Sequence, residues 1–186
     1  GLADFARFGI CQTAENPPRT RFALVHGNWA LDNSRNHMHP NPCGVNDEIS
    51  LLAELGCYLD VTFPAIGTSA QPGRINSIYY ATDAPAAPNS YDDGQPVRVG
   101  GTEAGDLMLL EGPLMVNWSD WRFGWHPTVE SGDIFADYPA SPERVSLWLD
   151  ANVHVLGQPN WVFIKLHSHG AHKADSSAVW GASFDS

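Results

Sequence analysis

The sequence predicts an α/β protein built from strand–helix–strand units. Three observations support this class. Residues 22–63 have the pattern of strand, loop, helix and strand; a second helix is predicted from Ser141; and residues 161–166 form an apolar run after that helix. A strand covered on both faces has apolar residues on both faces, so the run at 161–166 predicts a buried strand.

The first unit begins with a short apolar strand at residues 22–25, which ends at His26 in a loop rich in Asn, His and Pro. A helix is predicted next. Asn46 is the expected N-cap, the acidic residues after it suit the positive end of the helix dipole, and Gly56 ends the helix. Residues 58–63 follow as a strand, so this unit should place two parallel strands side by side.

The middle of the chain is predicted to be a decorated, β-rich loop region. Residues 67–101 carry many Gly, Pro, Asn and Asp residues around one short apolar piece, INSIYYATD, and an excursion of this length is often a binding loop. Residues 106–118 are also predicted to contribute strand structure. The second helix then has Ser141 as its N-cap and Pro142 in its first turn. We expect residues 1–186 to form one domain.

Composition limits the class of partner. Of the 186 residues 43% are hydrophobic and seven are Trp, and no apolar run is long enough to span a bilayer. The formal net charge of −11 argues against nucleic acid and anionic membranes as partners, because Lys and Arg are too few to neutralise phosphates. We expect a neutral, carbohydrate-like substrate.

The three cysteines, Cys11, Cys43 and Cys57, have the spacing of neither a disulfide framework nor a zinc motif. We expect them to be reduced thiols, which favours a cytoplasmic location. The sequence shows no signal peptide or tail motif. It begins with GLADF rather than Met, so we also expect that a natural N-terminus is missing or that a tag remains.

Five sequence blocks between Arg21 and Ala171 resemble one family. The blocks are VHGNWALDNS, CGVNDEISLLAELGCYLDVTFPA, INSIYYATD, EGPLMVNW and WVFIKLHSHGA. They are similar to the C-terminal part of the polysaccharide deacetylase-like family, in the NodB-type glycoside hydrolase/deacetylase superfamily. The resemblance implies an irregular (β/α) barrel, here only a partial one. It also implies removal of acetyl groups from sugars with a divalent metal, zinc or a similar ion, held by one Asp and two His.

The resemblance assigns one residue and leaves others without a match. The last motif of the family is an apolar strand that ends in Leu-His, and Leu166 and His167 match it, so His167 is the implied general acid. The catalytic Asp pair and the His-x-x-x-His metal motif of the family lie upstream of the matched region, and neither is found here. The metal ligands are therefore unknown, and the chain resembles a fragment of a longer gene product or a degenerate member.

Side-chain chemistry at the predicted strand ends gives further candidates. An imidazole titrates near neutral pH, so His26 and His167 are both candidates for proton transfer. Alternation along the strand at 58–63 places Asp60 where it could orient or charge-couple to a histidine. We expect Lys165 to be held inward by a carboxylate such as Asp60.

Residues of the loops that follow the strands are candidates for substrate binding. We expect Asn28 and Asp32 to line the site, Trp29 to stack on a sugar ring and His169 to lie beside it. Each also has a purely structural interpretation, because polar loop residues often satisfy only their own backbone and most Trp residues of an aromatic-rich chain belong to the core.

Two classes of function stay open. The first is a carbohydrate-directed hydrolase, a polysaccharide or amino-sugar deacetylase, in which a metal-activated water attacks an acyl carbonyl and His167 acts as the acid. The second is a non-catalytic carbohydrate-binding or structural fragment of the same fold. A third interpretation is a hydrolase that uses His26, Asp32 and His167, which requires these side chains to converge. Exposed barrel edges would favour a homo-oligomer.

Overall fold

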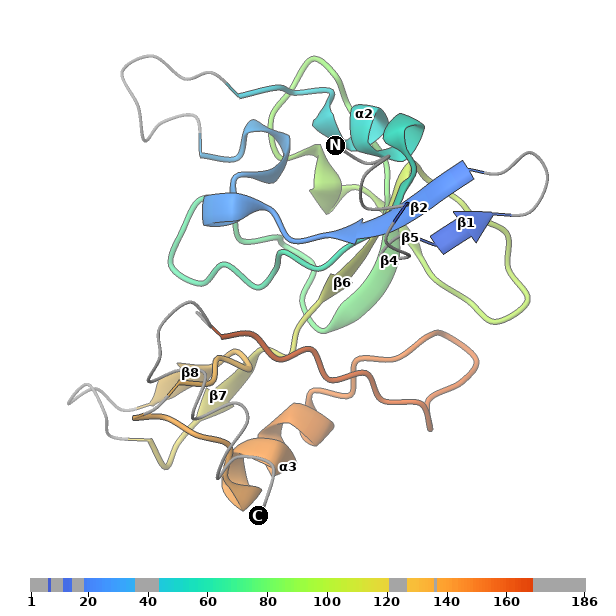
Figure 1. Ribbon diagram of the computed structural model, residues 1–186. Coiled ribbons are helices and arrows are strands. Elements are labelled where there is room, and N and C mark those ends of the chain that lie inside the picture. Colours follow the sequence, from blue (N-terminus) through green and yellow to red (C-terminus); the bar gives the residue numbers. More distant parts are fainter. Residues whose placement is uncertain are drawn as a thin grey trace.

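The computed structural model describes residue 7 and residues 12–14, 19–35, 44–120, 127–135 and 137–168. These residues form a mixed α/β structure, which confirms the predicted class (Figure 1). A six-stranded sheet has the order β1-β2-β3-β6-β4-β5, and β7 pairs with β8 in a separate ribbon. β2, β3 and β6 run parallel, whereas the other neighbouring strands are antiparallel.

The elements of the large sheet are β1 (Gln12–Ala14), β2 (Arg19–Leu24), β3 (Cys57–Asp60), β4 (Ser77–Ala81), β5 (Gly94–Pro96) and β6 (Leu107–Glu111). The ribbon consists of β7 (Met115–Asn117) and β8 (Thr128–Glu130). The helices are α2 (Glu48–Leu55) and α3 (Pro142–Asp150), with short 3-10 turns η1 (Gly27–Trp29), η2 (Leu31–Asn33) and η4 (Ser90–Asp92). The large sheet has β1 and β5 at its two edges, so the described residues show an open sheet and not a closed barrel.

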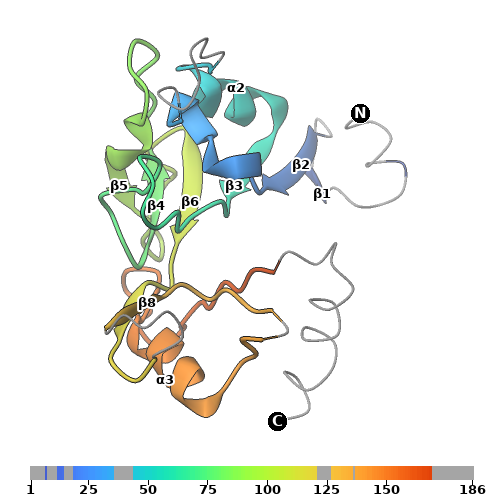
Figure 2. The same cartoon turned by 90° about the vertical axis from the view of Figure 1, so that its left-hand side faces the viewer.

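The predicted strand–helix–strand unit is confirmed. β2 and β3 are parallel neighbours that are joined through α2 (Figure 2). Gly56 ends α2 in the left-handed conformation, with a φ of 100°, as expected of a glycine at a helix C-terminus. The N-cap is Asp47 rather than the predicted Asn46, because the Asn46 carboxamide oxygen accepts a hydrogen bond from Asn33 at 2.7 Å.

The second predicted helix is confirmed as α3. Its N-cap is Ser141, whose hydroxyl oxygen accepts a hydrogen bond from the backbone N–H of Arg144 at 3.3 Å, and Pro142 is its first residue. Neither α3 nor any other helix in the described part of the chain has the length and apolar character needed to cross a bilayer.

The large sheet is covered on both faces. Ile78 and Tyr79 are adjacent in β4, so their side chains point to opposite faces. Tyr79 belongs to the main core, together with Ile49 of α2. Ile78 packs in a second cluster with Val153, from the segment that follows α3. The predicted excursion at 67–101 therefore contributes two strands, β4 and β5, to the sheet.

The predicted buried strand at residues 161–166 is wrong. The segment has no strand assignment, and its backbone hydrogen bonds are scattered, such as that from Phe163 N–H to the Val153 carbonyl at 2.8 Å. Trp161 is 63% exposed and Phe163 is 38% exposed. An apolar run produces a buried strand only where other strands flank it, and those partners are distant in the sequence and invisible to a local pattern.

A buried ion pair organises the small unit of β7, β8 and α3. Arg144 donates to both carboxylate oxygens of Glu130, at 2.7 and 2.8 Å, and the two side chains are 4% and 0% exposed. Trp148 donates its indole N–H to the same carboxylate at 2.8 Å. Burial alone would raise the pKa of Glu130, but the hydrogen bonds from Arg144 and Trp148 outweigh it and hold that pKa below its usual value.

Replacing Arg144 by Met should lower the free energy of unfolding by about 3–5 kcal/mol, because Glu130 would stay buried without its partner. Urea denaturation followed by circular dichroism measures the loss. Arg98→Met is the matched control, since Arg98 is exposed. A loss no larger than that of the control would show that the pair does not stabilise the small unit.

Candidate functional site

Polar side chains gather at the carboxyl ends of three parallel strands. His26 follows β2, Asp60 ends β3 and Glu111 ends β6. Parallel pairing places these three ends at one edge of the sheet, with Leu24 opposite Asp60 in the register. Ligands of open α/β sheets bind at this edge. We name as the carboxyl-end cluster the residues His26, Glu48, Asp60, Thr62, Glu111 and Lys165.

Asp60 is fully buried and is linked to His26 through Thr62. Its carboxylate accepts hydrogen bonds from the backbone N–H of Thr62 at 2.8 Å and from the Thr62 hydroxyl at 3.0 Å. The same hydroxyl oxygen accepts from the backbone N–H of His26 at 2.7 Å. Burial raises the pKa of Asp60 to about 6, although the hydrogen bonds from Thr62 and the charges of His26 and Lys165 oppose the rise.

His26 lies between two hydrogen-bond acceptors. Its Nε2 is 2.9 Å from a Glu48 carboxylate oxygen, and its Nδ1 is 2.9 Å from the Gly27 carbonyl oxygen. An imidazolium, with two N–H groups, satisfies both acceptors. The hydrogen bond with Glu48 raises the pKa of His26, against the effect of burial. The His26 side chain is 25% exposed, so it is within reach of a ligand.

Lys165 reaches the cluster from residues 161–168, which run between the large sheet and the small unit (Figure 1). Its ammonium donates to the carbonyl oxygen of Val61 at 3.2 Å and to that of Phe63. Burial lowers the pKa of Lys165 to about 8, while the charges of Glu111 and Asp60 oppose the decrease. Lys165 does point inward as predicted, but its direct partners are carbonyls and not a carboxylate.

Glu111 is the second fully buried carboxylate of the cluster. Its two oxygens accept hydrogen bonds from the Gln71 side chain at 2.9 Å and from the backbone N–H of Asn76 at 2.8 Å. Burial raises the pKa of Glu111, and these hydrogen bonds and the charge of Lys165 oppose the rise. Glu111 therefore fixes the loop between β3 and β4 onto the end of β6.

Glu48 and Glu111 were not among the predicted site residues. Glu111 is the charged residue in the apolar run LMLLEGPLM. A charge in such a run is buried only where partners compensate it, so its presence there could have indicated a site residue. Glu48 was interpreted only as an acidic residue at the start of a helix. Its second carboxylate oxygen accepts from the backbone N–H of Asp32 at 2.7 Å, so Glu48 holds both the loop and His26.

The loop residues predicted to bind substrate have different surroundings. Asn28 is exposed in η1, in the left-handed conformation with a φ of 56°. Trp29 is partly buried and packs against the main core. Asp32 is fully buried, and one of its carboxylate oxygens accepts from the backbone N–H and the hydroxyl of Ser90, at 2.6 and 2.7 Å. Burial raises the pKa of Asp32 to about 6.

His167 faces Asp133, with 3.7 Å between its Nε2 and an Asp133 carboxylate oxygen. Both side chains are about one-third exposed, at 33% and 30%. His26 and the backbone of Asp32 share one partner, Glu48, but the Asp32 carboxylate binds Ser90 and His167 contacts Asp133. The described contacts therefore do not show the three side chains converging, as the third interpretation requires. His169 lies outside the described residues.

The part of the chain that the structure describes contains no set of ligands for the metal that the family resemblance implies. There, no group of three or more His, Cys, Asp or Glu side chains is placed to hold a metal ion. The described residues thus do not fit the arrangement of one Asp and two His that the resemblance implies.

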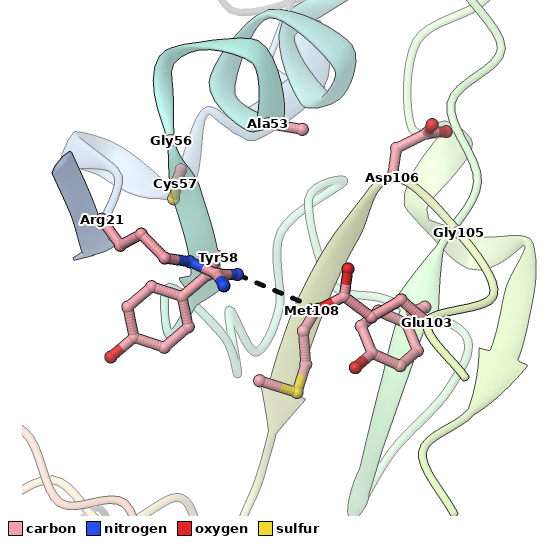
Figure 3. A pocket seen from close by; sticks show the side chains of 10 residues that line it. Arg21, Ala53, Gly56, Cys57, Tyr58, Glu103, Gly105, Asp106 and Met108 are labelled. Atoms are coloured by element: carbon pink, nitrogen blue, oxygen red, sulfur yellow. Dashed lines mark ion pairs between the residues drawn. The ribbon is translucent and has the colours of Figure 1, made fainter. Parts of the chain in front are cut away.

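A cavity of about 130 Å³ lies at the opposite, amino ends of β3 and β6 (Figure 3). Arg21 lines it, with its guanidinium 3.9 Å from a Glu103 oxygen and 5.3 Å from the centre of the Tyr58 ring. Cys57 is a free, buried thiol at its wall, and burial raises its pKa to about 11, so it stays protonated. Cys11 and Cys43 lie outside the described residues. This cavity shares no residue with the carboxyl-end cluster, which is the candidate site.

The Lys165 amine should react with acetic anhydride with a midpoint near pH 8 instead of the usual 10.5, because burial disfavours its charged form. Competitive labelling read by mass spectrometry measures this midpoint. Asp60→Asn should shift the midpoint to lower pH, since a negative charge that favours the ammonium is lost. The Lys165→Arg variant identifies the labelled peptide. A midpoint near 10.5 would mean that the amine is in water.

Comparison with known proteins assigns no family. No protein-family model matches the chain, and neither curated proteins nor solved structures give a match. A function for the chain is therefore inferred from its residues and from the geometry described above.

Proposed function

We propose that the chain belongs to a carbohydrate-directed hydrolase that removes acetyl groups from a polysaccharide or an amino sugar. The main support is the convergence of an imidazole, an amine and two buried carboxylates at the carboxyl ends of parallel strands. Groups of this kind supply general acids and bases. The family resemblance is the second support, and under it β2, β3 and β6 would be part of the wall of a (β/α) barrel.

In this proposal Asp60 and Lys165 are the acid–base pair. Burial brings their pKa values to about 6 and about 8, so between these values Asp60 is ionised and Lys165 is protonated. A water that attacks the acetyl carbonyl gives a proton to the Thr62 hydroxyl oxygen, and Thr62 passes its own proton to Asp60. Lys165 gives a proton to the departing amine, which leaves with the electrons of the broken C–N bond.

His26 stabilises the negative charge that develops on the carbonyl oxygen. The hydrogen bond with Glu48 raises the pKa of His26 and so favours its imidazolium form, whose charge acts on the nearby Asp60. A charge that is already in place needs no reorganisation during the reaction, which makes it effective in a partly buried site. The resemblance instead implies His167 as the acid, and His167 is two residues from Lys165 in the same segment, so the variants below compare the two.

A second candidate is the non-catalytic binding or structural fragment. It is favoured by one observation: the Lys165 ammonium and both nitrogens of the His26 ring already contact protein acceptors. Side chains in a purely structural network have such contacts. Activity measurements distinguish the two candidates.

The chain should release acetate from N-acetylated oligosaccharides, and Lys165→Met should reduce kcat/KM by about 10²- to 10⁴-fold, as loss of a general acid does. A similar loss is expected for Asp60→Asn. His154→Ala is the matched control, since His154 lies after α3 and its ring contacts the Asn152 carbonyl. If His167→Ala abolishes turnover while Lys165→Met does not, His167 is the acid. No release by the unaltered, folded chain would favour the non-catalytic fragment.

The pH profile of kcat/KM should be bell-shaped, with limbs near pH 6 and pH 8. Activity rises through the pKa of Asp60 because the base must lose its proton, and falls through that of Lys165 because the acid must keep it. Lys165→Arg should lower activity about as far as Lys165→Met, and the residual activity should lack the alkaline limb near pH 8, because arginine keeps its charge but does not release a proton in this range. An alkaline limb unchanged by this substitution would exclude Lys165 as the acid.

A further inference from the structure

The buried carboxylate of Asp32, which the proposed acid–base chemistry does not use, joins two loops. Asp32 belongs to the loop after β2, which also carries His26, and its side chain is fully buried. One of its oxygens accepts hydrogen bonds from the backbone N–H and the hydroxyl of Ser90. Ser90 is the first residue of η4, so Asp32 fastens the loop between β4 and β5 to the loop after β2.

The Ser90 hydroxyl contacts a second carboxylate. Its oxygen is 2.7 Å from an Asp32 oxygen and 3.1 Å from an Asp83 oxygen. A serine hydroxyl has one hydrogen, and an ionised carboxylate has none to donate. Both contacts can be hydrogen bonds only when one of the two carboxyl groups carries a proton. The geometry is therefore that of a carboxyl pair that holds one proton between its two members.

The other oxygen of the Asp32 carboxylate leads to the same conclusion. It is buried and has no hydrogen-bond partner in the structure. Leaving a buried oxygen without a partner costs more free energy when the carboxyl group is charged than when it is neutral. The surroundings of Asp32 thus favour the protonated form.

The groups that face Asp32 from neighbouring elements do not favour its charged form. Glu48 of α2 and Asp83 of the loop after β4 are both acidic. Tyr91 of η4 is neutral, because burial raises the pKa of its phenol. Burial raises the pKa of Asp32 to about 6, and the charges of Asp83 and Glu48 add to the rise, although the hydrogen bonds from Ser90 oppose it.

The backbone at Asp32 is also held by these contacts. Asp32 and Asn33 are in the left-handed conformation, with φ values of 53° and 54°. Residues other than glycine keep this conformation where their surroundings hold it. The Asp32 carbonyl accepts from the backbone N–H of Asn89 at 3.1 Å, in the same loop as Ser90. If the loop between β4 and β5 moves away, the turn at Asp32 loses these contacts and can relax.

We propose that Asp32, Ser90 and Asp83 form a proton-dependent latch, which docks the loop between β4 and β5 onto the loop after β2 and loosens when its proton leaves. Docking buries Asp32, so the docked state binds the proton more tightly than the open state does. The stabilisation of the docked state is complete below the ordinary pKa of 3.8, and it is lost as the pH rises through about 6.

Glu48 connects the latch to the carboxyl-end cluster. One Glu48 oxygen accepts from the backbone N–H of Asp32, and the other contacts Nε2 of His26. The latch therefore helps to fix the carboxylate that raises the pKa of His26. The proposal does not depend on the proposed hydrolase activity, and it is tested without a substrate.

The test is hydrogen exchange of the whole chain, measured by mass spectrometry on peptides from residues 82–93 at about pH 4 and about pH 7. Rates are corrected for the intrinsic effect of pH on exchange. We expect the opening equilibrium of this loop to increase at least about tenfold from the lower to the higher pH. The pKa values of 3.8 and about 6 allow a change of up to about 100-fold. Equal opening at both pH values would overturn the proposal.

Two variants separate the latch from other effects of pH. Asp32→Asn is uncharged at every pH, like the protonated carboxyl group. In Asp83→Asn the amide oxygen can keep the hydrogen bond from the backbone N–H of Ser50, which places the amide N–H group opposite the Ser90 oxygen and supplies the missing hydrogen. At about pH 7 each variant should open at least about tenfold less than the unaltered chain, and at about pH 4 each should open equally.

Asp93→Asn is the matched control, because Asp93 is an exposed carboxylate of the same loop, and it should exchange like the unaltered chain at both pH values. Asp83 is only half-buried, so Asp83→Asn decides the matter if Asp32→Asn does not fold. Opening at about pH 7 that is unchanged in the folded variants, or that decreases equally in Asp93→Asn, would refute the latch.

Discussion

The contact of Lys165 with the end of β3 is the interaction on which the arrangement of the molecule depends. The Lys165 ammonium contacts the carbonyls after β3, close to the charges of Asp60 and Glu111, which are both fully buried. Buried charges are tolerated only with compensating partners, so the three groups depend on one another. Because Lys165 belongs to the segment beside the small unit, the same contact also joins that unit to the large sheet.

Local signals predicted the parts of the fold that local chemistry determines. The Ser141 cap of α3 and the Gly56 terminus of α2 are set by hydrogen bonds within a few residues, and both were predictable. The segment 161–166 was not, because burial of an apolar run depends on strands from elsewhere in the chain. The (β/α) barrel came from the resemblance, and the described strands form an open sheet.

The residues of the candidate site also divide into those that the sequence predicts and those that it does not. His26 and Asp60 were predictable because they end strands of a parallel pair, and the carboxyl ends of such strands meet. The contact of His26 with Glu48 joins residues that are 22 positions apart, and that of Glu111 with Gln71 joins residues 40 apart. No periodic pattern encodes such pairs. The contact of His167 with Asp133 could not be predicted from the sequence for the same reason.

The distance along the chain between Lys165 and its partner has a consequence for the order of folding. Lys165 and the Val61 carbonyl that it contacts are 104 residues apart, whereas the strands of the large sheet are complete at Glu111. On a ribosome the sheet can therefore assemble before Lys165 is synthesised. During that interval Glu111 lacks the nearby charge of Lys165 and Asp60 has only that of His26, and closing so long a loop is slow. The carboxyl-end cluster is thus among the last parts of the described chain to reach its native state.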